Sequence, residues 1–230
     1  MEKTLFLDLI EGYYNTQLTR FQLQYFFSTN KYLAVSCPRR GGKSFIAQID
    51  ALYTCTTPDK RVVIILPNKA SLNITREDLI DKTNALSGYI EVSNSNTSTI
   101  CFNNGSVIHL LTASNAENDF IGCRFNKVII EEPDYIKNIE DVIMRLEICM
   151  TFSPDAQIKL IGTHSISNHN LKSYMLNPYY EKISVTAKSI YSPMTNQQLE
   201  QLKREIQDDN VFYLQHLNEV TPSILNRLIE

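Results

Sequence analysis

The residues with the clearest chemical potential form a short loop in which Gly42, Lys43 and Ser44 follow an apolar run. In phosphate-binding loops of the pattern G-x-x-x-x-G-K-[ST], backbone amides cradle phosphates at a helix N-terminus, the lysine neutralises charge, and the hydroxyl holds Mg²⁺. Cys37 stands here at the first glycine position. The loop predicts binding of a nucleoside triphosphate by residues Cys37, Pro38, Arg39, Arg40, Gly41, Gly42, Lys43 and Ser44.

Two further apolar runs end in polar side chains that suit the same chemistry. The run at 127–130 is followed by Glu131 and Glu132, and the run at 158–162 is followed by Thr163. In a parallel sheet such strand ends emerge beside the phosphate-binding loop. One carboxylate can then organise Mg²⁺ while the other polarises the attacking water, and Thr163 can sense the γ-phosphate. The alternative is a strand whose exposed end is simply acidic.

The loop arginines and an upstream glutamine extend this prediction. Arg39 and Arg40 precede Lys43 by four and three residues, so at least one guanidinium should reach the phosphates, unless both only shape the loop through salt bridges. Gln22 carries an amide that can both donate to and accept from adenine. The alternative for Gln22 is the polar face of an ordinary amphipathic helix.

The surrounding pattern is that of alternating strands and helices. Strands are expected at 32–37, 61–66, 127–131 and 158–162, and helices at 44–54, 70–86 and 138–150. Runs at 89–93, 99–102 and 106–112, with Asn103-Asn104-Gly105 between the last two, predict a β-hairpin. The fold class is therefore α/β of the P-loop NTPase type, with a mainly parallel sheet, a hairpin insertion and a small C-terminal helical subdomain. We expect one ATPase core at 1–190, with a helical segment at 1–30, and a helical lid at 191–230.

Composition narrows the class of protein. The chain has 230 residues with 22 basic and 25 acidic side chains, so it lacks the overall basic charge that dominates static nucleic-acid binding. Its five cysteines stand singly, which argues against a disulfide framework or zinc cluster. No apolar run approaches a membrane span, and no secretion signal opens the chain, so we expect a soluble protein that is not exported.

Together these motifs resemble the ATPase domain of the large terminase subunit, the DNA-packaging motor of tailed phages and herpesviruses. The resemblance covers nearly the whole chain. The most specific parts are the arginine-bearing loop 38–44 and the hairpin 102–108; others are Phe21-Gln22, the strand 61–68 ending in Leu-Pro-Asn, and Gly162-Thr163-His164.

The resemblance implies ATP hydrolysis with Mg²⁺, coupled to movement of double-stranded DNA into a procapsid. It gives Ser44 and Glu131 as metal ligands, Glu132 as catalytic base, Arg39 as cis arginine and Thr163 as coupling residue. The family usually has Asp where Glu131 stands, and often Pro where His164 stands.

The implied partners are DNA, a portal protein, a small terminase subunit and other copies of the chain in a ring, within an infected host cell. Large terminases usually continue into a nuclease domain, and we find no second acidic cluster, so we expect no DNA cleavage by this chain. Two other functions are compatible with the motifs: a helicase or DNA-repair ATPase, and a nucleotide-binding scaffold without turnover.

Overall fold

The computed structural model describes residues 1–116, 123–165, 168–186 and 204. Its strands are β1 (Tyr32–Ser36), β2 (Arg61–Leu66), β3 (Val92–Ser95), β4 (Thr99–Phe102), β5 (Val107–Thr112), β6 (Lys127–Glu131), β7 (Gln157–Gly162) and β8 (Glu181–Ser184). Its helices are α1 (Lys3–Tyr14), α2 (Arg20–Phe27), α3 (Lys43–Cys55), α4 (Lys69–Thr83), α5 (Ile139–Met150) and α6 (Asn170–Leu176), with short 3₁₀ turns η1 (Asn84–Leu86) and η2 (Pro133–Tyr135).

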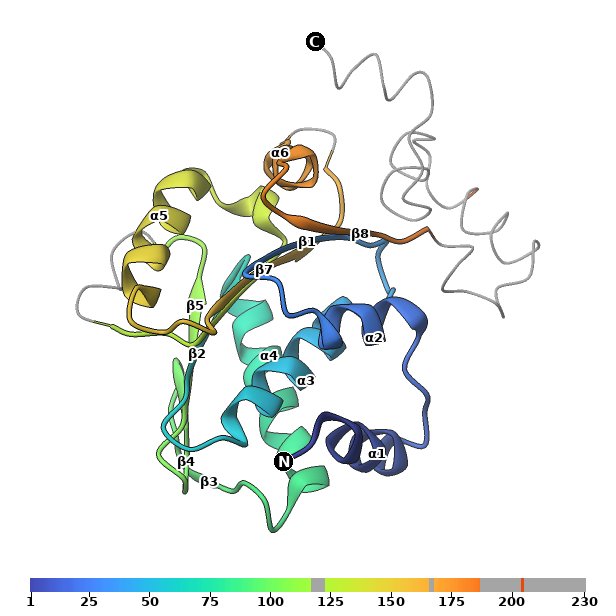
Figure 1. The fold of residues 1–230 in the computed structure, drawn as a ribbon, viewed down its shortest axis with the longest axis vertical. Helices are drawn as coiled ribbons and strands as arrows, with labels where there is room; N and C mark the ends of the chain where they lie inside the picture. Colours follow the sequence, from blue (N-terminus) through green and yellow to red (C-terminus); the bar gives the residue numbers. More distant parts are fainter. Residues whose placement is uncertain (117–122, 166–167, 187–203, 205–230) are drawn as a thin grey trace.

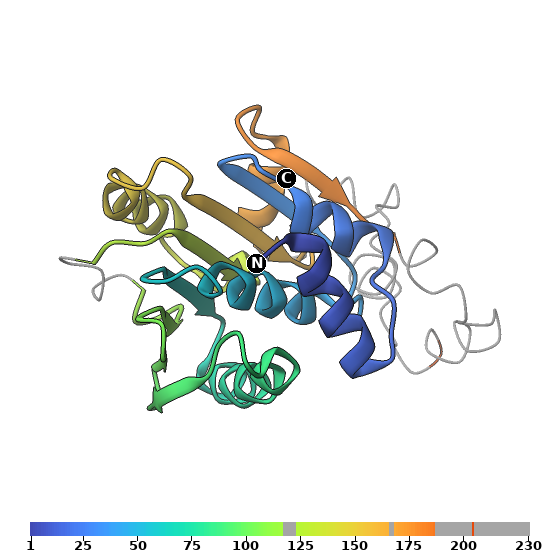
Figure 2. The same ribbon diagram turned by 60° about the horizontal axis from the view of Figure 1, so that its bottom comes forward.

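The strands form one sheet in the order β3-β4-β5-β2-β6-β7-β1-β8. All pairings from β5 to β8 are parallel, and only β3–β4 and β4–β5 are antiparallel. Helices α1 to α4 cover one face, and α5 and α6 cover the other (Figures 1 and 2). This confirms the predicted α/β class with a mainly parallel sheet.

Alternation of side chains along each strand divides the core between the two faces. In β2, Val62, Ile64 and Leu66 pack with α1 to α4, whereas Val63 and Ile65 pack with α5. Both sets are buried, which explains why the strand reads as a continuous apolar run rather than an alternating one. Burial of each such side chain contributes about 1.5–3 kcal/mol, so the central strands are firmly fixed.

The predicted hairpin is confirmed. Strands β4 and β5 pair antiparallel, and the backbone N–H of Phe102 donates to the carbonyl of Ser106 at 2.9 Å. Gly105 adopts φ 83°, the left-handed conformation that makes glycine suitable in such a turn. Strand β5 then continues parallel to β2 and joins the hairpin to the main sheet.

The topology brings the chemistry-bearing strand ends together. Strand β7 lies between β6 and β1, and all three run parallel, so the segments that follow them meet at one edge of the sheet. The predicted C-terminal helical lid at 191–230 lies outside the described residues, apart from residue 204.

Candidate nucleotide and Mg²⁺ site

The loop between β1 and α3 has the backbone of a phosphate-binding turn. Gly42 precedes α3 with φ 82°, and Arg40 also takes a left-handed conformation with φ 61°. The Cys37 N–H donates to the carbonyl of Gly162 at 3.0 Å, which ties the loop to the end of β7. The first N–H groups of α3 therefore open at the sheet edge as a ready anion site.

Lys43 is held in the middle of this edge. Its Nζ donates to the carbonyls of Cys37 (3.3 Å) and Pro38 (3.1 Å) and to Thr163 Oγ1 (2.7 Å). It also lies 3.4 Å from Glu132 Oε1. The ammonium is thus surrounded by oxygens, the atoms that phosphate groups present, and it connects the loop with both predicted strand ends.

Glu131 lies behind the loop and is almost completely buried. Ser44 Oγ donates to its Oε2 at 2.5 Å, whereas its Oε1 is buried with no hydrogen-bond partner among the described residues. Burial raises the pKa of Glu131 to about 7, against the lowering effect of the Ser44 hydrogen bond. A buried carboxylate oxygen without such a partner, next to a hydroxyl, is a donor set that suits a hard cation.

Glu132 has an unusual backbone, φ 52° and ψ 63°, immediately before η2. This left-handed conformation costs a non-glycine residue on the order of 1–3 kcal/mol. Its carboxylate accepts from the Thr163 N–H at 2.9 Å and from Thr163 Oγ1 at 3.4 Å. A Cβ at Gly162 would approach the Glu132 Cα at 3.3 Å and Pro133 Cδ at 2.9 Å, so the glycine permits the close approach of the segment after β6 to the end of β7.

These groups surround a cavity of about 580 Å³. Among the predicted site residues, those that line it are Arg39, Arg40, Gly41, Gly42, Lys43, Ser44, Glu132 and Thr163. The structure places Cys37, Pro38, Glu131 and Gln22 behind the cavity wall rather than on it. Burial raises the pKa of Cys37 to about 12, so its thiol stays neutral, and its contribution here is made by backbone groups.

The sequence prediction missed Asp134, whose buried carboxylate organises the loop after β7. It accepts from the backbone N–H groups of Ser165 (3.0 Å) and Leu171 (2.8 Å). Asn68 and Ser71, at the start of α4, also line the cavity. Desolvation raises the pKa of Asp134, and the two N–H donors oppose that rise. The sequence signal that could have pointed to Asp134 was its position, two residues after the pair Glu131-Glu132.

Gln22 is engaged at both ends of its amide. Its Oε1 accepts from the N–H of Thr19 at 2.8 Å in a capping box at the start of α2, and its Nε2 donates to the Gly42 carbonyl at 3.3 Å. A Cβ at Gly42 would lie 2.6 Å from Nε2. Gln22 therefore braces the phosphate loop in this structure, and its predicted contact with adenine stays a prediction.

We expect Gln22→Ala to lower the free energy of unfolding of nucleotide-free protein by about 1–2 kcal/mol, since it removes a cap and a hydrogen bond to the loop. Urea unfolding measures this, with the exposed Gln24→Ala as matched control. Unchanged stability together with a lost preference for ATP over GTP would instead assign Gln22 to adenine recognition.

Comparisons with known proteins agree with this geometry. Residues 35–212 match the family model described as terminase large subunit, T4likevirus-type, N-terminal. A search of curated protein sequences gives no significant match.

The fold is similar to that of solved large terminases. A mutant of the ATPase domain from Thermus phage P74-26 has a TM-score of 0.75 at 17% identity, over 94% of this chain and 97% of that domain. The large terminase of a thermophilic bacteriophage, solved in complex with ADP, has a TM-score of 0.69 at 13% identity, over 87% and 53%. The large terminase of bacteriophage HK97 has a TM-score of 0.67 at 13% identity, over 89% and 51%.

The chain thus spans about half the length of the ADP-bound and HK97 large terminases. Because the family model covers most of the chain and the fold agrees, the chain belongs to the T4likevirus-type terminase large-subunit family and corresponds to its N-terminal, ATPase-domain part.

Proposed function

We propose that this chain hydrolyses ATP to drive double-stranded DNA into a phage procapsid. The observation that carries the proposal is the meeting of Lys43, Glu131, Glu132 and Thr163 at one sheet edge, within a chain of the terminase family. Binding of ADP by a large terminase that shares the fold supports nucleotide binding at this edge.

The residues fit a nucleotide-bound Mg²⁺. Ser44 and Glu131 would hold the ion, because the hydroxyl and the partnerless Oε1 are oxygen donors side by side. Few protein ligands are needed, since Mg²⁺ commonly keeps waters and takes phosphate oxygens. Mg²⁺, when bound, supplies charge neutralisation on the phosphates. The resemblance implies Asp at this position, and the longer side chain of Glu131 still places its carboxylate within hydrogen-bond distance of Ser44.

The remaining residues divide the chemistry among them. Lys43 exchanges its carbonyl partners for phosphate oxygens, and Arg39 and Arg40, on the cavity wall, add positive charge where negative charge develops. Glu132 orients the attacking water and takes its proton. Thr163 contacts both Lys43 and Glu132, so loss of the γ-phosphate changes its hydrogen bonds and moves the segment after β7.

The family assignment supports double-stranded DNA, a portal protein, a small terminase subunit and a ring of copies as partners. No helix in the described residues is both long and apolar enough to cross a lipid bilayer. The lack of DNA cleavage by this chain stays a prediction.

The test is ATP hydrolysis by purified protein carrying Lys43→Ala. We expect turnover to fall by about 10²–10³-fold, because a preorganised charge on the transferred phosphate is lost. Lys69→Ala, an exposed lysine that does not line the cavity, is the matched control and should retain wild-type turnover. Wild-type turnover in Lys43→Ala would overturn the assignment of this site.

A further inference from the structure

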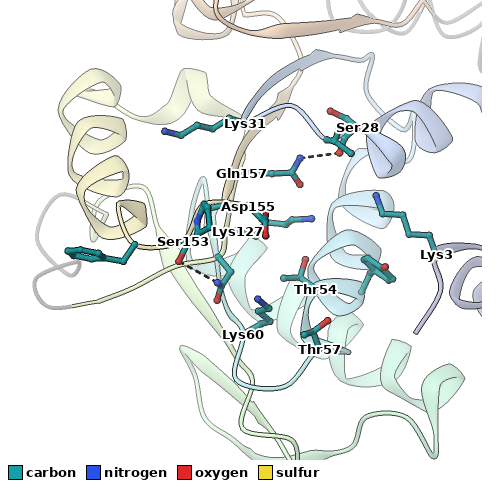
Figure 3. Close-up of a pocket in the computed structure, with 16 residues that line it drawn as sticks. Lys3, Ser28, Lys31, Thr54, Thr57, Lys60, Lys127, Ser153, Asp155 and Gln157 are labelled. Atoms are coloured by element: carbon teal, nitrogen blue, oxygen red, sulfur yellow. Dashed lines mark hydrogen bonds between the residues drawn. The ribbon is translucent and has the colours of Figure 1, made fainter.

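A second cavity lies at the opposite edge of the sheet, where β1, β2, β6 and β7 begin (Figure 3). Its volume is about 550 Å³. Its wall comes from α1, the 28–31 loop, the end of α3, the start of β6 and the segment after α5. Nothing in the proposed ATP chemistry uses it.

The cavity carries a net positive charge. Lys3, Lys31, Lys60 and Lys127 line it, and Asp155 is the single carboxylate among its lining residues. The lining residues therefore carry a surplus of three positive charges. Behind Lys127, Lys159 and Asp50 are buried together, and because their charges cancel they leave this surplus unchanged. The C-terminal ends of α2, α3 and α5 each add about half a negative charge at most, which offsets about half of the surplus. Behind the wall, Glu181 accepts a hydrogen bond from the lining residue Ser28, so the net charge of the cavity is positive but moderate.

The lysines differ in how far they are already engaged. Lys127 pairs with Asp50, Lys3 donates to the carbonyl of Phe26 at 3.0 Å, and Lys31 lies over the ring of Tyr32. The Lys60 side chain has no hydrogen bond or ion pair with any other described residue, and it projects into the cavity (Figure 3). Thr57 and Thr29 add hydroxyl groups to the wall. Lysines with neutral hydroxyl donors are a phosphate-binding combination.

The positive surface continues beyond this cavity. A neighbouring hollow shares Asn126, Phe152 and Ser153 with it and adds Arg61 and Arg124 against Asp59. A single small anion needs one such hollow, whereas a run of phosphates along a duplex can occupy both. This extent favours a polyanion, on a chain whose overall net charge is −3.

We propose that this basic edge, formed by the lysine-lined cavity and the adjoining Arg61–Arg124 hollow, contacts the phosphate backbone of double-stranded DNA. The inference rests on the proposed packaging function, which supplies the DNA, and it assigns a contact surface on the side of the sheet opposite the ATP site. Because the two sites are on opposite edges, DNA and ATP do not compete for the same groups.

The test compares wild type, Lys60→Ala, Lys31→Ala/Lys60→Ala and the control Lys69→Ala, which removes an exposed lysine at the start of α4, beyond the opposite end of β2. Fluorescence anisotropy with a mixed-sequence duplex gives affinity across a salt series. Each lost phosphate contact should reduce the slope of log K against log salt by about 0.9, and should weaken binding by about fivefold to tenfold near 0.1 M salt. The Lys69→Ala protein should match wild type.

Basal ATP turnover, measured without DNA on the same proteins, should be unchanged in every variant. If the double variant binds DNA with wild-type affinity and slope while its ATP turnover is intact, the surface assignment is wrong and the ATPase proposal stands. A final arm titrates tripolyphosphate with the ATP site saturated by a non-hydrolysable ATP analogue. Lost tripolyphosphate binding with unchanged DNA affinity would assign the cavity to a small anion and overturn the DNA proposal.

Discussion

Replacement of Glu132 by Gln should reduce ATP turnover by about 10²–10⁴-fold, the usual contribution of a positioned general base. ATP binding should persist, because Lys43 and the N–H groups at the start of α3 are untouched. The isosteric amide retains an oxygen that can accept from the Thr163 N–H, now at 2.9 Å from the carboxylate, but it cannot accept a proton from water. Steady-state hydrolysis and binding of a fluorescent ATP analogue measure the two quantities separately.

The position of Glu132 makes this a sharp test. Its strained backbone, its hydrogen bonds to Thr163 and its 3.4 Å approach to Lys43 fix the carboxylate at the cavity wall. The matched control is Glu140→Gln on the exposed side of α5, which should leave turnover unchanged. Turnover by Glu132→Gln within a factor of about three of wild type would remove Glu132 from the catalytic role.

The same experiment decides between a motor and a nucleotide-binding scaffold. Hydrolysis by wild type and its loss in Glu132→Gln, with binding retained in both, excludes a protein that only binds. Binding without hydrolysis in wild type would favour the scaffold, and the contact between Glu131 and Ser44 would then be the first feature to examine.

The strands that position this site were predictable because they are buried on both faces. In β6, Val128, Ile129 and Ile130 alternate between the two core clusters, so no polar residue interrupts the run and its end at the Glu pair is clear. The edge strand β8 was not predicted. It has four residues with only Ile183 buried, which is too little periodicity to distinguish it from a loop.

The brace at Gln22 and the contacts of Asp134 could not be inferred for a different reason. Both act through backbone groups, the Gly42 carbonyl for Gln22 and the N–H groups of Ser165 and Leu171 for Asp134. Backbone groups are the same at every position, so sequence does not show which of them a polar side chain will meet. Asp134 adjoined a recognised motif, yet its partners lie more than thirty residues away.

A buried ion cluster between α3 and the sheet was also not predictable from the sequence. Asp50, in the middle of α3, pairs with Lys127 at the start of β6 and with Lys159 in β7, at 2.5 and 3.0 Å. Lys159 Nζ also donates to the Tyr25 carbonyl at 2.9 Å and lies over the Tyr25 ring. Burial opposes ionisation of Asp50, but the two lysines hold its pKa below the usual value, so it stays charged. Burial lowers the pKa of Lys159 to about 8.

We expect Asp50→Ala to lower the free energy of unfolding by about 3–5 kcal/mol, the usual cost of removing one partner from a buried ion pair. The loss arises because two buried ammonium groups then face each other without a carboxylate. Urea unfolding of nucleotide-free protein measures it, with the exposed Asp155→Ala as matched control, which should change stability by less than about 0.5 kcal/mol. An Asp50→Ala effect as small as that of the control would contradict the prediction.

If Asp50→Ala fails to fold, a compensated variant distinguishes the stability cost of unpaired charge from the cost of lost packing. In Asp50→Leu/Lys127→Met/Lys159→Met all three charges leave together, and a well-packed apolar replacement of a buried ion cluster is often neutral or stabilising. We therefore expect stability near wild type. The cluster joins α3, which follows the phosphate loop, to β6 and β7, the strands that precede Glu132 and Thr163. ATP turnover in the compensated variant then distinguishes two roles of these ions. Wild-type turnover would mean that they serve only stability, whereas reduced turnover would mean that they also hold α3, β6 and β7 in position for catalysis.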